Sequence, residues 1–481
     1  MKDQSHPESD GDKMARRRQR NEVADDDTIV AISTPRGRGG IGVVRLSGNR
    51  AVEISGALFR RSAPSANGTG AAVFGRFMDR RGEPIDEGYR IVFQPPRSFT
   101  GEETVELWAH GSPAVLRSLV EEAVELGARP ATPGEFTLRA FLSGRIDAPQ
   151  AEAIRDLVEA RTVYQAKVAH EQAAGRISSR VNRFKDRLIE VVARIEASIE
   201  FSEEEDAGRF LPGGGVMPEI DALRRDIATL AASYERGRRV REGATVALIG
   251  SVNVGKSSLF NRLLEEERAI VTPIAGTTRD RIEETLDLNG IPVSLIDTAG
   301  LHAPRDEADA EAMRRSRDAI ASADLRLLVI DRSRPLRADE RALLGDQSGG
   351  ETVVLLNKSD LPGHVERDLI GALRPGVGIL EVSARTGDGI DRVRDRIAAA
   401  VTTGPAGTGE QVFLTNVRHR DLLMRADEAL ARCAGAARDG LGEECLVLDL
   451  KEALDRLGEI SGEVGIEGIY DRIFSQFCIG K

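Results

Sequence analysis

The spacing of glycine, lysine and serine at residues 250–257 predicts a phosphate-binding loop. The segment reads G-S-V-N-V-G-K-S and fits G-x-x-x-x-G-K-[ST]. Backbone N–H groups of such a loop can surround phosphates, Lys256 would reach the outer phosphates, and Ser257 would ligate Mg²⁺. The apolar run at 246–249 reads as a buried strand and residues 258–264 read as the start of a helix, which is the strand–loop–helix context that this motif requires.

Two more segments predict the surroundings of a metal ion and a γ-phosphate. Residues 293–300 read V-S-L-I-D-T-A-G, an apolar strand that ends in D-x-x-G. Asp297 suits an outer-sphere contact with Mg²⁺, and Gly300 can offer its N–H to a γ-phosphate. Between this motif and the P-loop, residues 276–280 read G-T-T-R-D and fit switch I, with Thr278 as the second protein ligand of Mg²⁺. Ordinary turn chemistry is the alternative for that threonine.

A further pair of segments indicates that the base is guanine. Residues 353–360 form an apolar strand that ends in N-K-S-D, and the Asp360 carboxylate can accept hydrogen bonds from the ring N–H and the exocyclic amine of guanine. Adenine presents an acceptor and no amine at that edge, so the carboxylate discriminates by hydrogen-bond complementarity. After one more apolar run, residues 383–385 read S-A-R, where the matching loop of GTPases offers N–H groups to the guanine carbonyl.

Motifs in this order, each after a strand, predict a GTPase. The residues that the motifs and switch I assign to GTP binding are Asn253, Val254, Gly255, Lys256, Ser257, Ser258, Gly276, Thr277, Thr278, Asp297, Thr298, Ala299, Gly300, Asn357, Lys358, Asp360, Ser383, Ala384 and Arg385.

The residue that would orient the attacking water is not evident from the motifs. Ras-like enzymes place a glutamine just after D-x-x-G, whereas this chain has Leu301, which cannot take that role. His302 is a candidate, with an ordinary surface histidine as the alternative. The acidic stretch at 305–311 offers several carboxylates, although acids are also favoured at a solvated helix N-terminus.

Length, charge and cysteine content limit the classes to which the protein can belong. The 481 residues suffice for about three domains of ordinary size. The formal net charge of −11 means that any RNA contact must be local or shared with a partner. Cys433, Cys445 and Cys478 are odd in number and lack metal-like spacing, which suits a reducing compartment. No apolar stretch approaches the length of a membrane span, and we expect a cytoplasmic protein.

Residues 1–24 are predicted to form a disordered tail. They are polar and charged, carry A-R-R-R-Q-R at 15–20, and lack the apolar region of a signal peptide. Met14 is an alternative start of translation.

The nucleotide motifs alternate between strands and helices over residues 243–403, which predicts an inserted, doubly wound α/β domain. Both flanks, 146–242 and 404–481, carry apolar residues at spacings of three and four, as amphipathic helices do. Each such stripe needs a partner, so we expect one helical domain built from both flanks. The stripes are Val181, Phe184, Leu188, Val192, Ile195 and Ile199; Ile220, Leu223, Ile227 and Leu230; and Leu446, Leu450, Leu454 and Leu457.

Residues 25–145 differ from the rest, because several short strand-like runs predict a small α+β domain. Within it, residues 35–40 read P-R-G-R-G-G, and both a plain hairpin turn and an anion cradle are open for this loop. The predicted fold class is therefore multidomain, α/β and α+β, with a central helical domain.

Three segments outside the GTPase module, together with the end of the chain, carry a resemblance to a known family. Residues 28–48 include P-R-G-R-G-G-I-G-V-V-R-L-S-G, residues 98–111 read S-F-T-G-E-E-T-V-E-L-W-A-H-G, and residues 133–152 begin with P-G-E-F-T-L-R-A-F. The chain ends in F-C-I-G-K at 477–481. From about residue 25 to its end, the chain resembles the MnmE (TrmE) family of tRNA-modification GTPases.

The resemblance implies properties that residue patterns alone do not. It implies an N-terminal domain that dimerises and binds a tetrahydrofolate derivative of the 5-formyl or methylene type. It also implies an FAD-dependent, MnmG-type partner in a heterotetramer or larger assembly. Together the two proteins would install an aminomethyl or carboxymethylaminomethyl group at carbon 5 of the wobble uridine of certain tRNAs.

Residue roles follow from the resemblance by position. The folate-contacting residues would be Arg45, Glu106, Arg145 and Lys481, where Arg145 replaces a lysine that the family often has. Cys478 matches the family's functional cysteine, with a buried structural thiol as the alternative.

The resemblance also implies that K⁺ takes the task of an arginine finger. Its expected ligands are Asn253, Thr272, Ile274 and Thr277, and the same loop adds Thr272, Pro273, Ile274 and Ala275 to the GTP-binding set. The family's water-orienting glutamate falls on Asp309, which is one methylene shorter. Glu307 and Glu311 are neighbouring acids that could substitute for it.

The main hypothesis is therefore a K⁺-stimulated GTPase within a tRNA-modifying complex. A ribosome-assembly or regulatory GTPase that acts as a binding switch is the alternative, although the chain has neither a GxxG-bearing KH-like segment nor a second P-loop. A third hypothesis is a folate enzyme that acts alone, with the GTPase as its regulator.

Overall fold

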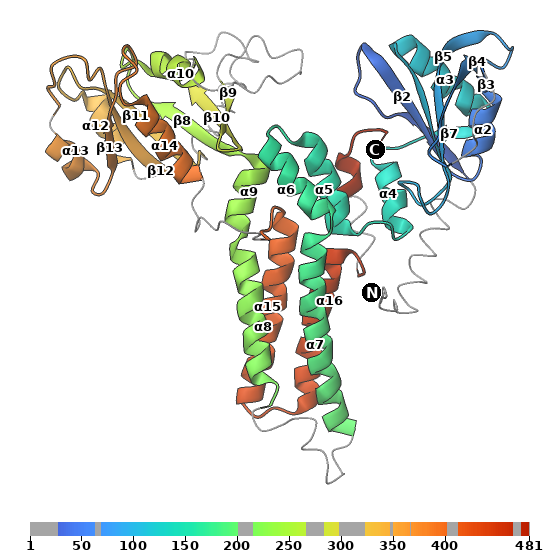
Figure 1. Cartoon of the computed structure of the whole chain (residues 1–481). Helices are drawn as coiled ribbons and strands as arrows, with labels where there is room; N and C mark the ends of the chain where they lie inside the picture. Colours follow the sequence, from blue (N-terminus) through green and yellow to red (C-terminus); the bar gives the residue numbers. More distant parts are fainter. Residues whose placement is uncertain are drawn as a thin grey trace. The chain divides into compact units, whose positions relative to one another are not determined.

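The computed structural model describes residues 27–62, 69–200, 215–265, 283–297, 323–346, 350–365, 367–401, 412–464 and 473–480. Among these residues, the chain forms two compact units. The first comprises Met1–Arg155, Glu171–Ile227 and Leu422–Lys481, and the second comprises Asp156–His170 and Ala228–Asp421. Figure 1 labels their helices and strands.

The N-terminal part of the first unit is built on a seven-stranded sheet with the order β3-β4-β5-β6-β2-β1-β7. Its neighbouring strands are antiparallel except β1 and β7, which are parallel. Helices α2 and α3 pack on the face that carries Val44, Leu46 and Leu107. The elements are β1 Thr28–Ile32, β2 Gly39–Ser47, α2 Ala51–Ala57, β3 Phe59–Arg61, β4 Ala72–Met78, β5 Pro84–Phe93, β6 Thr104–Gly111, α3 Pro113–Glu125 and β7 Ala128–Pro130.

The glycine-rich segment at 35–40 runs from the connection of β1 and β2 into β2. Because these two strands are antiparallel neighbours, the segment belongs to a hairpin, as one of the two interpretations of its sequence predicts.

The rest of the first unit is helical. Ion pairs join successive helices of a bundle: Arg187 of α7 with Asp226 of α8, and Arg224 of α8 with Asp427 of α15. Helices α7 and α16 also pack directly on each other. The bounds are α4 Glu135–Leu142, α5 Ala148–Glu159, α7 Arg176–Glu200, α8 Met217–Ala232, α15 Val417–Arg438, α16 Glu443–Ser461 and the 3₁₀ turn η3 Phe474–Gln476.

Most of the predicted apolar stripe positions are buried, which explains why these helices associate. Val181, Phe184, Leu188 and Ile195 of α7 are each at most 1% exposed. At the ends of the stripes, burial is less complete, as it is at Ile199. The bundle thus places its hydrophobic residues where the spacing predicts them.

The second unit contains a six-stranded sheet with the order β13-β12-β11-β8-β10-β9. Its strands are parallel except β9, which is antiparallel to β10. Along β11, Leu327 and Val329 pack with α10 and α14, while Leu328 and Ile330 pack with α12 and α13. Helices on both faces define a doubly wound domain. The elements are α6 Val163–Ala173, α9 Tyr234–Glu242, β8 Ala244–Ile249, α10 Lys256–Glu265, β9 Glu283–Leu288, β10 Ile291–Asp297, β11 Leu325–Asp331, α12 Ala338–Gly345, β12 Glu351–Asn357, α13 Arg367–Leu373, β13 Gly378–Glu381 and α14 Ile390–Val401.

The predicted fold class is confirmed by these sheets and by the helical bundle. Among the described residues, no helix combines the length and the apolar character that crossing a membrane would require.

Candidate functional site

Strand β8 and helix α10 hold the predicted P-loop between them. β8 lies between β10 and β11 in the sheet, and α10 begins at Lys256. The loop backbone adopts conformations that side chains rarely allow, since φ is 148° at Gly250, 66° at Asn253 and 97° at Gly255. A Cβ on Gly255 would lie 2.3 Å from Asn357 Nδ2, so glycine is required there. The loop is thus shaped to expose backbone N–H groups, as anion binding demands.

The lysine and serine that follow the loop are held by their own contacts. Lys256 is 7% exposed, and its Nζ donates to the carbonyls of Gly250 and Ser251 at 2.8 and 2.9 Å. Burial lowers the pKa of Lys256. Ser257 Oγ donates to Asp297 Oδ2 at 2.8 Å, which brings the P-loop and the D-x-x-G motif together. A hydroxyl next to a carboxylate is an oxygen donor set that suits Mg²⁺.

The predicted base-reading residues meet in one pocket of about 430 Å³ at the carboxyl end of β12. Asp360 Oδ1 accepts a hydrogen bond from Ser383 Oγ at 2.6 Å, and Oδ2 forms an ion pair with Arg385 at 2.5 Å. The hydrogen bond from Ser383 holds the pKa of Asp360 below its ordinary value. The carboxylate is therefore an ionised acceptor, as the recognition of guanine requires. The pocket is lined by Gly255, Ser258, Asn357, Lys358, Asp360, Leu361, Ala384 and Arg385.

Asn357 links the P-loop to the loop at 383–385. It is 2% exposed, its Nδ2 donates to the Val254 carbonyl at 2.8 Å, and its Oδ1 accepts from the Ala384 N–H at 3.1 Å. Lys358 beside it donates from Nζ to Asp331 at 2.6 Å. These contacts fix the spacing between the phosphate and base sites.

Several predicted residues lie outside the part of the chain that the structure describes, and their roles stay predictions. They are Thr272, Pro273, Ile274, Ala275, Gly276, Thr277, Thr278, Thr298, Ala299, Gly300, Leu301, His302, Glu307, Asp309, Glu311 and Lys481.

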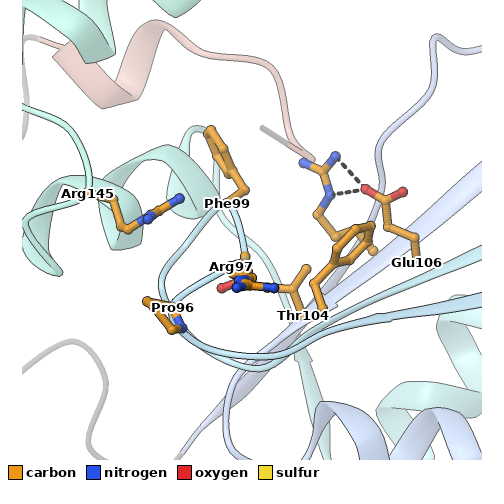
Figure 2. A pocket seen from close by; sticks show the side chains of 9 residues that line it. Pro96, Arg97, Phe99, Thr104, Glu106 and Arg145 are labelled. Carbon is orange, nitrogen blue, oxygen red and sulfur yellow. Dashed lines mark hydrogen bonds and ion pairs between the residues drawn. The ribbon is translucent and has the colours of Figure 1, made fainter. Parts of the chain in front are cut away.

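A second pocket, of about 530 Å³, lies in the N-terminal part (Figure 2). Arg45 and Glu106 are cross-strand partners on β2 and β6. Both Nε and Nη2 of Arg45 donate to Glu106 Oε1, at 3.1 and 2.9 Å, and Trp108 Nε1 donates to Oε2 at 2.9 Å. The Arg45 guanidinium also lies 5.9 Å from the centroid of the Phe99 ring, within the range of a cation–π contact.

The loop before β6 and the turn after α4 complete this pocket. Figure 2 shows Arg97 and Phe99 on that loop and Arg145 on the turn. The loop is anchored by Glu102, whose Oε2 accepts from Arg139 Nη1 at 3.1 Å and from Ser47 Oγ at 2.8 Å. The structure thus brings together the predicted residues Arg45, Glu106 and Arg145.

The C-terminal segment pairs with the N-terminal part of the same unit. The Gly134 N–H donates to the Cys478 carbonyl at 3.4 Å, Pro133 and Ile479 form an isolated antiparallel bridge, and Ser33 Oγ donates to the Gly480 carbonyl at 3.1 Å. Cys478 itself is exposed, so it is not the buried thiol that the sequence left as an alternative. Its functional role stays a prediction.

Sequence reasoning missed several residues in or beside the pockets, among them Ser98 and Arg262. Ser98 lines the second pocket, is 4% exposed, and its hydroxyl has no hydrogen-bond partner among the described residues. Arg262 of α10 donates from Nη2 to the Arg385 carbonyl at 3.0 Å and so holds the loop at 383–385. The S-F-T-G-E segment contains Ser98, but only the fold reveals that this hydroxyl is buried without a partner.

Comparisons with known proteins identify the family of the chain. A family model described as the MnmE helical domain matches residues 149–478, and one described as the N-terminus of the GTP-binding protein TrmE matches residues 28–145. The tRNA modification GTPase MnmE of Koribacter versatilis (strain Ellin345) is 41% identical over 459 residues, which are 95% of this chain and 99% of that protein. The protein of the same name from Aquifex aeolicus (strain VF5) is 41% identical over 455 residues, 94% of this chain and 99% of its own length.

Among solved structures, the G-domain of FeoB from Methanococcus jannaschii is similar, with a TM-score of 0.25 and 25% identity, over 33% of this chain and 97% of that chain. The full-length relatives and the two family models are the decisive findings. They show that the chain belongs to the MnmE family.

Proposed function

We propose that the chain is a GTP hydrolase that acts in the modification of tRNA. The observation that carries the proposal is the convergence of Ser257, Asp297 and Asn357 around one phosphate-binding loop, beside a pocket that contains Asp360. The chain belongs to a family whose members at 41% identity are named tRNA modification GTPases. Both the geometry and the family therefore point to the same reaction.

The residues of the nucleotide site have separate tasks in this reaction. The P-loop N–H groups and Lys256 bind the phosphates, and Asp360 accepts from guanine. Ser257 and Thr278 would hold Mg²⁺, and Asp297 would make an outer-sphere contact with the ion. When bound, the ion neutralises charge on the β- and γ-phosphates. The hydrogen bond from Ser257 to Asp297 supports this assignment, because it already places a hydroxyl beside a carboxylate.

Hydrolysis is proposed to depend on K⁺, with Asn253, Thr272, Ile274 and Thr277 as its ligands. Support comes from Asn253, whose left-handed backbone (φ 66°) lies within the P-loop. A monovalent cation at that position supplies positive charge next to the phosphates, which is the task of an arginine finger. Asp309 is proposed to orient the attacking water, with Glu307 and Glu311 as the alternatives.

The pocket around Arg45 and Glu106 is proposed to bind a tetrahydrofolate derivative. Glu106 Oε1 accepts two hydrogen bonds from Arg45, whereas Oε2 accepts from Trp108 and keeps a second lone pair for a ring N–H group. The exposed guanidinium of Arg145 suits a carboxylate, and the Phe99 ring offers a face for an aromatic ring system. Lys481 would complete this site, and Cys478 would act in the modification reaction.

A homodimer through the N-terminal sheet is proposed from an exposed apolar surface on it. Phe74, Tyr89 and Trp108 are cross-strand neighbours on β4, β5 and β6, and they are 44, 45 and 36% exposed. Ile41 beside them is 63% exposed, and all four line a shallow groove of about 540 Å³. Contiguous apolar patches of this kind are typical of protein interfaces. A second copy of this chain is the proposed occupant.

An MnmG-type FAD protein is proposed as the further partner, with the wobble uridine of certain tRNAs as the site of modification. The net charge of −11 supports a shared rather than a solitary contact with RNA. The cytoplasm stays the predicted place of action.

Two measurements test the function. Purified wild type should hydrolyse GTP, whereas Asp360→Asn should lose affinity for GTP and gain affinity for xanthosine triphosphate, whose ring carbonyl replaces the amine. Asp368→Asn, an exposed aspartate on α13, is the matched control. In cells that lack the chain, the wobble-uridine modification should be absent. Unchanged nucleotide preference in Asp360→Asn, or unchanged tRNA in the deletion strain, would overturn the corresponding half of the proposal.

A further inference from the structure

Helix α6 begins with a reciprocal cap formed by two buried polar residues. The Gln165 N–H donates to Thr162 Oγ1 at 3.1 Å, and the Thr162 N–H donates to Gln165 Oε1 at 3.2 Å. Thr162 and Gln165 are only 5 and 7% exposed. This capping box uses the acceptor oxygens of both side chains and leaves their O–H and N–H hydrogens for other partners.

The hydroxyl hydrogen of Thr162 goes to the turn between β9 and β10. Thr162 Oγ1 donates to the Gly290 carbonyl at 2.5 Å. The turn has positive φ at Asn289 and Gly290, 54° and 84°. A Cβ on Gly290 would lie 2.4 Å from Tyr164 Cβ, so the turn and the first residues of α6 are in close contact. Val168 of α6 joins the hydrophobic core of the same domain.

The amide hydrogens of Gln165 go to the end of α9. Nε2 donates to the carbonyls of Val240 and Arg241 at 2.8 and 2.9 Å. These carbonyls lie in the last turn of the helix, where they lack intrahelical partners. Arg241 Nε in turn donates to Asp156 Oδ1 at 2.9 Å, which ties the same helix end to the segment before α6.

Both elements that the cap holds lead directly to the nucleotide site. α9 ends at Glu242, and β8 follows at Ala244 and runs to the P-loop. β10 runs from the turn to Asp297, a strand of seven residues that spans about 23 Å at the usual rise. β9 begins directly after the segment predicted as switch I. The cap therefore holds the starts of β8 and β10, which pair with each other. Beyond the other ends of these strands lies the nucleotide site, where Ser257, after the P-loop, donates to Asp297 at the end of β10.

The chain on either side of this segment continues into the helical part. Asp156–His170 belongs to the compact unit of the GTPase domain, whereas residues up to Arg155 and from Glu171 belong to the other unit. We propose that Thr162 and Gln165 are positioning residues that couple the nucleotide state of the GTPase domain to the helical part of the chain. A shift of the β9–β10 hairpin against β8 would strain the bridge from Thr162 to Gly290 and the bridge from Gln165 to the end of α9. Because both bridges start from the cap of α6, this helix would have to move with them. The proposal rests on the proposed function.

Three substitutions test the bridges. Gln165→Glu separates the bridge from the cap, because it keeps the oxygen that caps α6 but replaces the two donors to α9 by a carboxylate that faces carbonyls. Thr162→Val removes both the bridge to Gly290 and the acceptor that caps the Gln165 N–H, whereas Thr162→Ser keeps the hydroxyl for both contacts and should retain function. Tyr164→Phe is the matched control, because the Tyr164 hydroxyl has no hydrogen bond among the described residues.

The full chain is used for all measurements. Gln165→Glu and Thr162→Val should keep GTP hydrolysis within about threefold in kcat and KM, while tRNA modification falls about tenfold or more, since one lost coupling bond corresponds to roughly that factor. Thr162→Ser and Tyr164→Phe should match wild type in both assays. Equal modification by all variants would overturn the proposal, and so would equal losses of hydrolysis and modification.

A second measurement needs no substitution and guards against unfolded variants. Hydrogen exchange of the amides at 156–170 should differ at least severalfold between wild type bound to GDP and wild type bound to a non-hydrolysable GTP analogue. Identical exchange in the two states would refute the coupling even if wild type hydrolyses GTP and modifies tRNA. Failure of those two wild-type activities would instead refute the proposed function.

Discussion

Replacing Asn357 by alanine tests whether the two halves of the nucleotide site depend on one buried amide. Asn357 bridges the Val254 carbonyl and the Ala384 N–H, at 2.8 and 3.1 Å, and is 2% exposed. Alanine cannot replace either bond. The Val254 carbonyl and the Ala384 N–H would then lose a partner at a site that excludes most water.

The expected cost follows from these two bonds. A buried polar group left without its partner costs about 1–3 kcal/mol, so two such groups lower the free energy of unfolding of the GTPase domain by roughly 2–6 kcal/mol. For a domain of this size, that corresponds to a decrease in Tm of roughly 4–24 °C. The affinity for GDP should fall about tenfold, since the loops lose their fixed spacing.

The chain offers an internal control for the measurement. Its single tryptophan, Trp108, lies in β6 of the N-terminal sheet. Urea unfolding followed by tryptophan fluorescence should therefore stay unchanged, while the transition reported by a fluorescent GDP analogue moves to lower urea. Asn261→Ala, on the exposed face of α10, should change stability by less than about 0.5 kcal/mol. If Asn357→Ala is as stable as Asn261→Ala and binds GDP equally well, the bridge does not hold the site.

Three other predictions address residues beyond this bridge. GTP turnover should be much faster in K⁺ than in Na⁺ at equal ionic strength, and equal rates would remove the cation from the mechanism. Deletion of residues 477–481 should abolish tRNA modification but leave hydrolysis nearly intact, because the tail pairs with Pro133 and Ser33 of the N-terminal part; an equal loss of hydrolysis would make the tail a folding element. Asp309→Ala should lower kcat by about 10²–10³ with nucleotide binding preserved, the usual effect of losing a water-orienting group. A fully active Asp309→Ala beside an inactive Glu307→Ala or Glu311→Ala would show that the glutamate of the family aligns elsewhere.

The strands that precede the nucleotide motifs could be predicted to within one or two residues, whereas β9 and β11 were not predicted. Apolar runs at 246–249 and 379–382 correspond to β8 Ala244–Ile249 and β13 Gly378–Glu381. The central parallel strands are buried from both faces, so their sequences are continuously apolar and easily recognised. The order of the loops after them then brings Ser257 near Asp297 without further information.

The position of α6 could not be predicted in the same way. In the structure, the helix cap accounts for only half of the hydrogen-bonding capacity of Thr162 and Gln165. Their other partners are backbone carbonyls at Gly290, Val240 and Arg241, and a carbonyl is the same in every sequence. The pairing of Arg45 with Glu106 was equally hidden, because it depends on the register of β2 and β6.

The two pockets differ in how completely the protein satisfies their polar groups, and this difference indicates what each requires from its ligand. In the guanine pocket, Asn357 and Asp360 have partners within the protein, and these contacts hold the carboxylate in a defined position. In the pocket around Arg45, Glu106 Oε2 accepts from Trp108 and keeps a second lone pair for a ligand. Discrimination in the first pocket therefore follows from complementarity to the carboxylate that Ser383 and Arg385 hold, and in the second from the donors that a ligand offers to Glu106 Oε2.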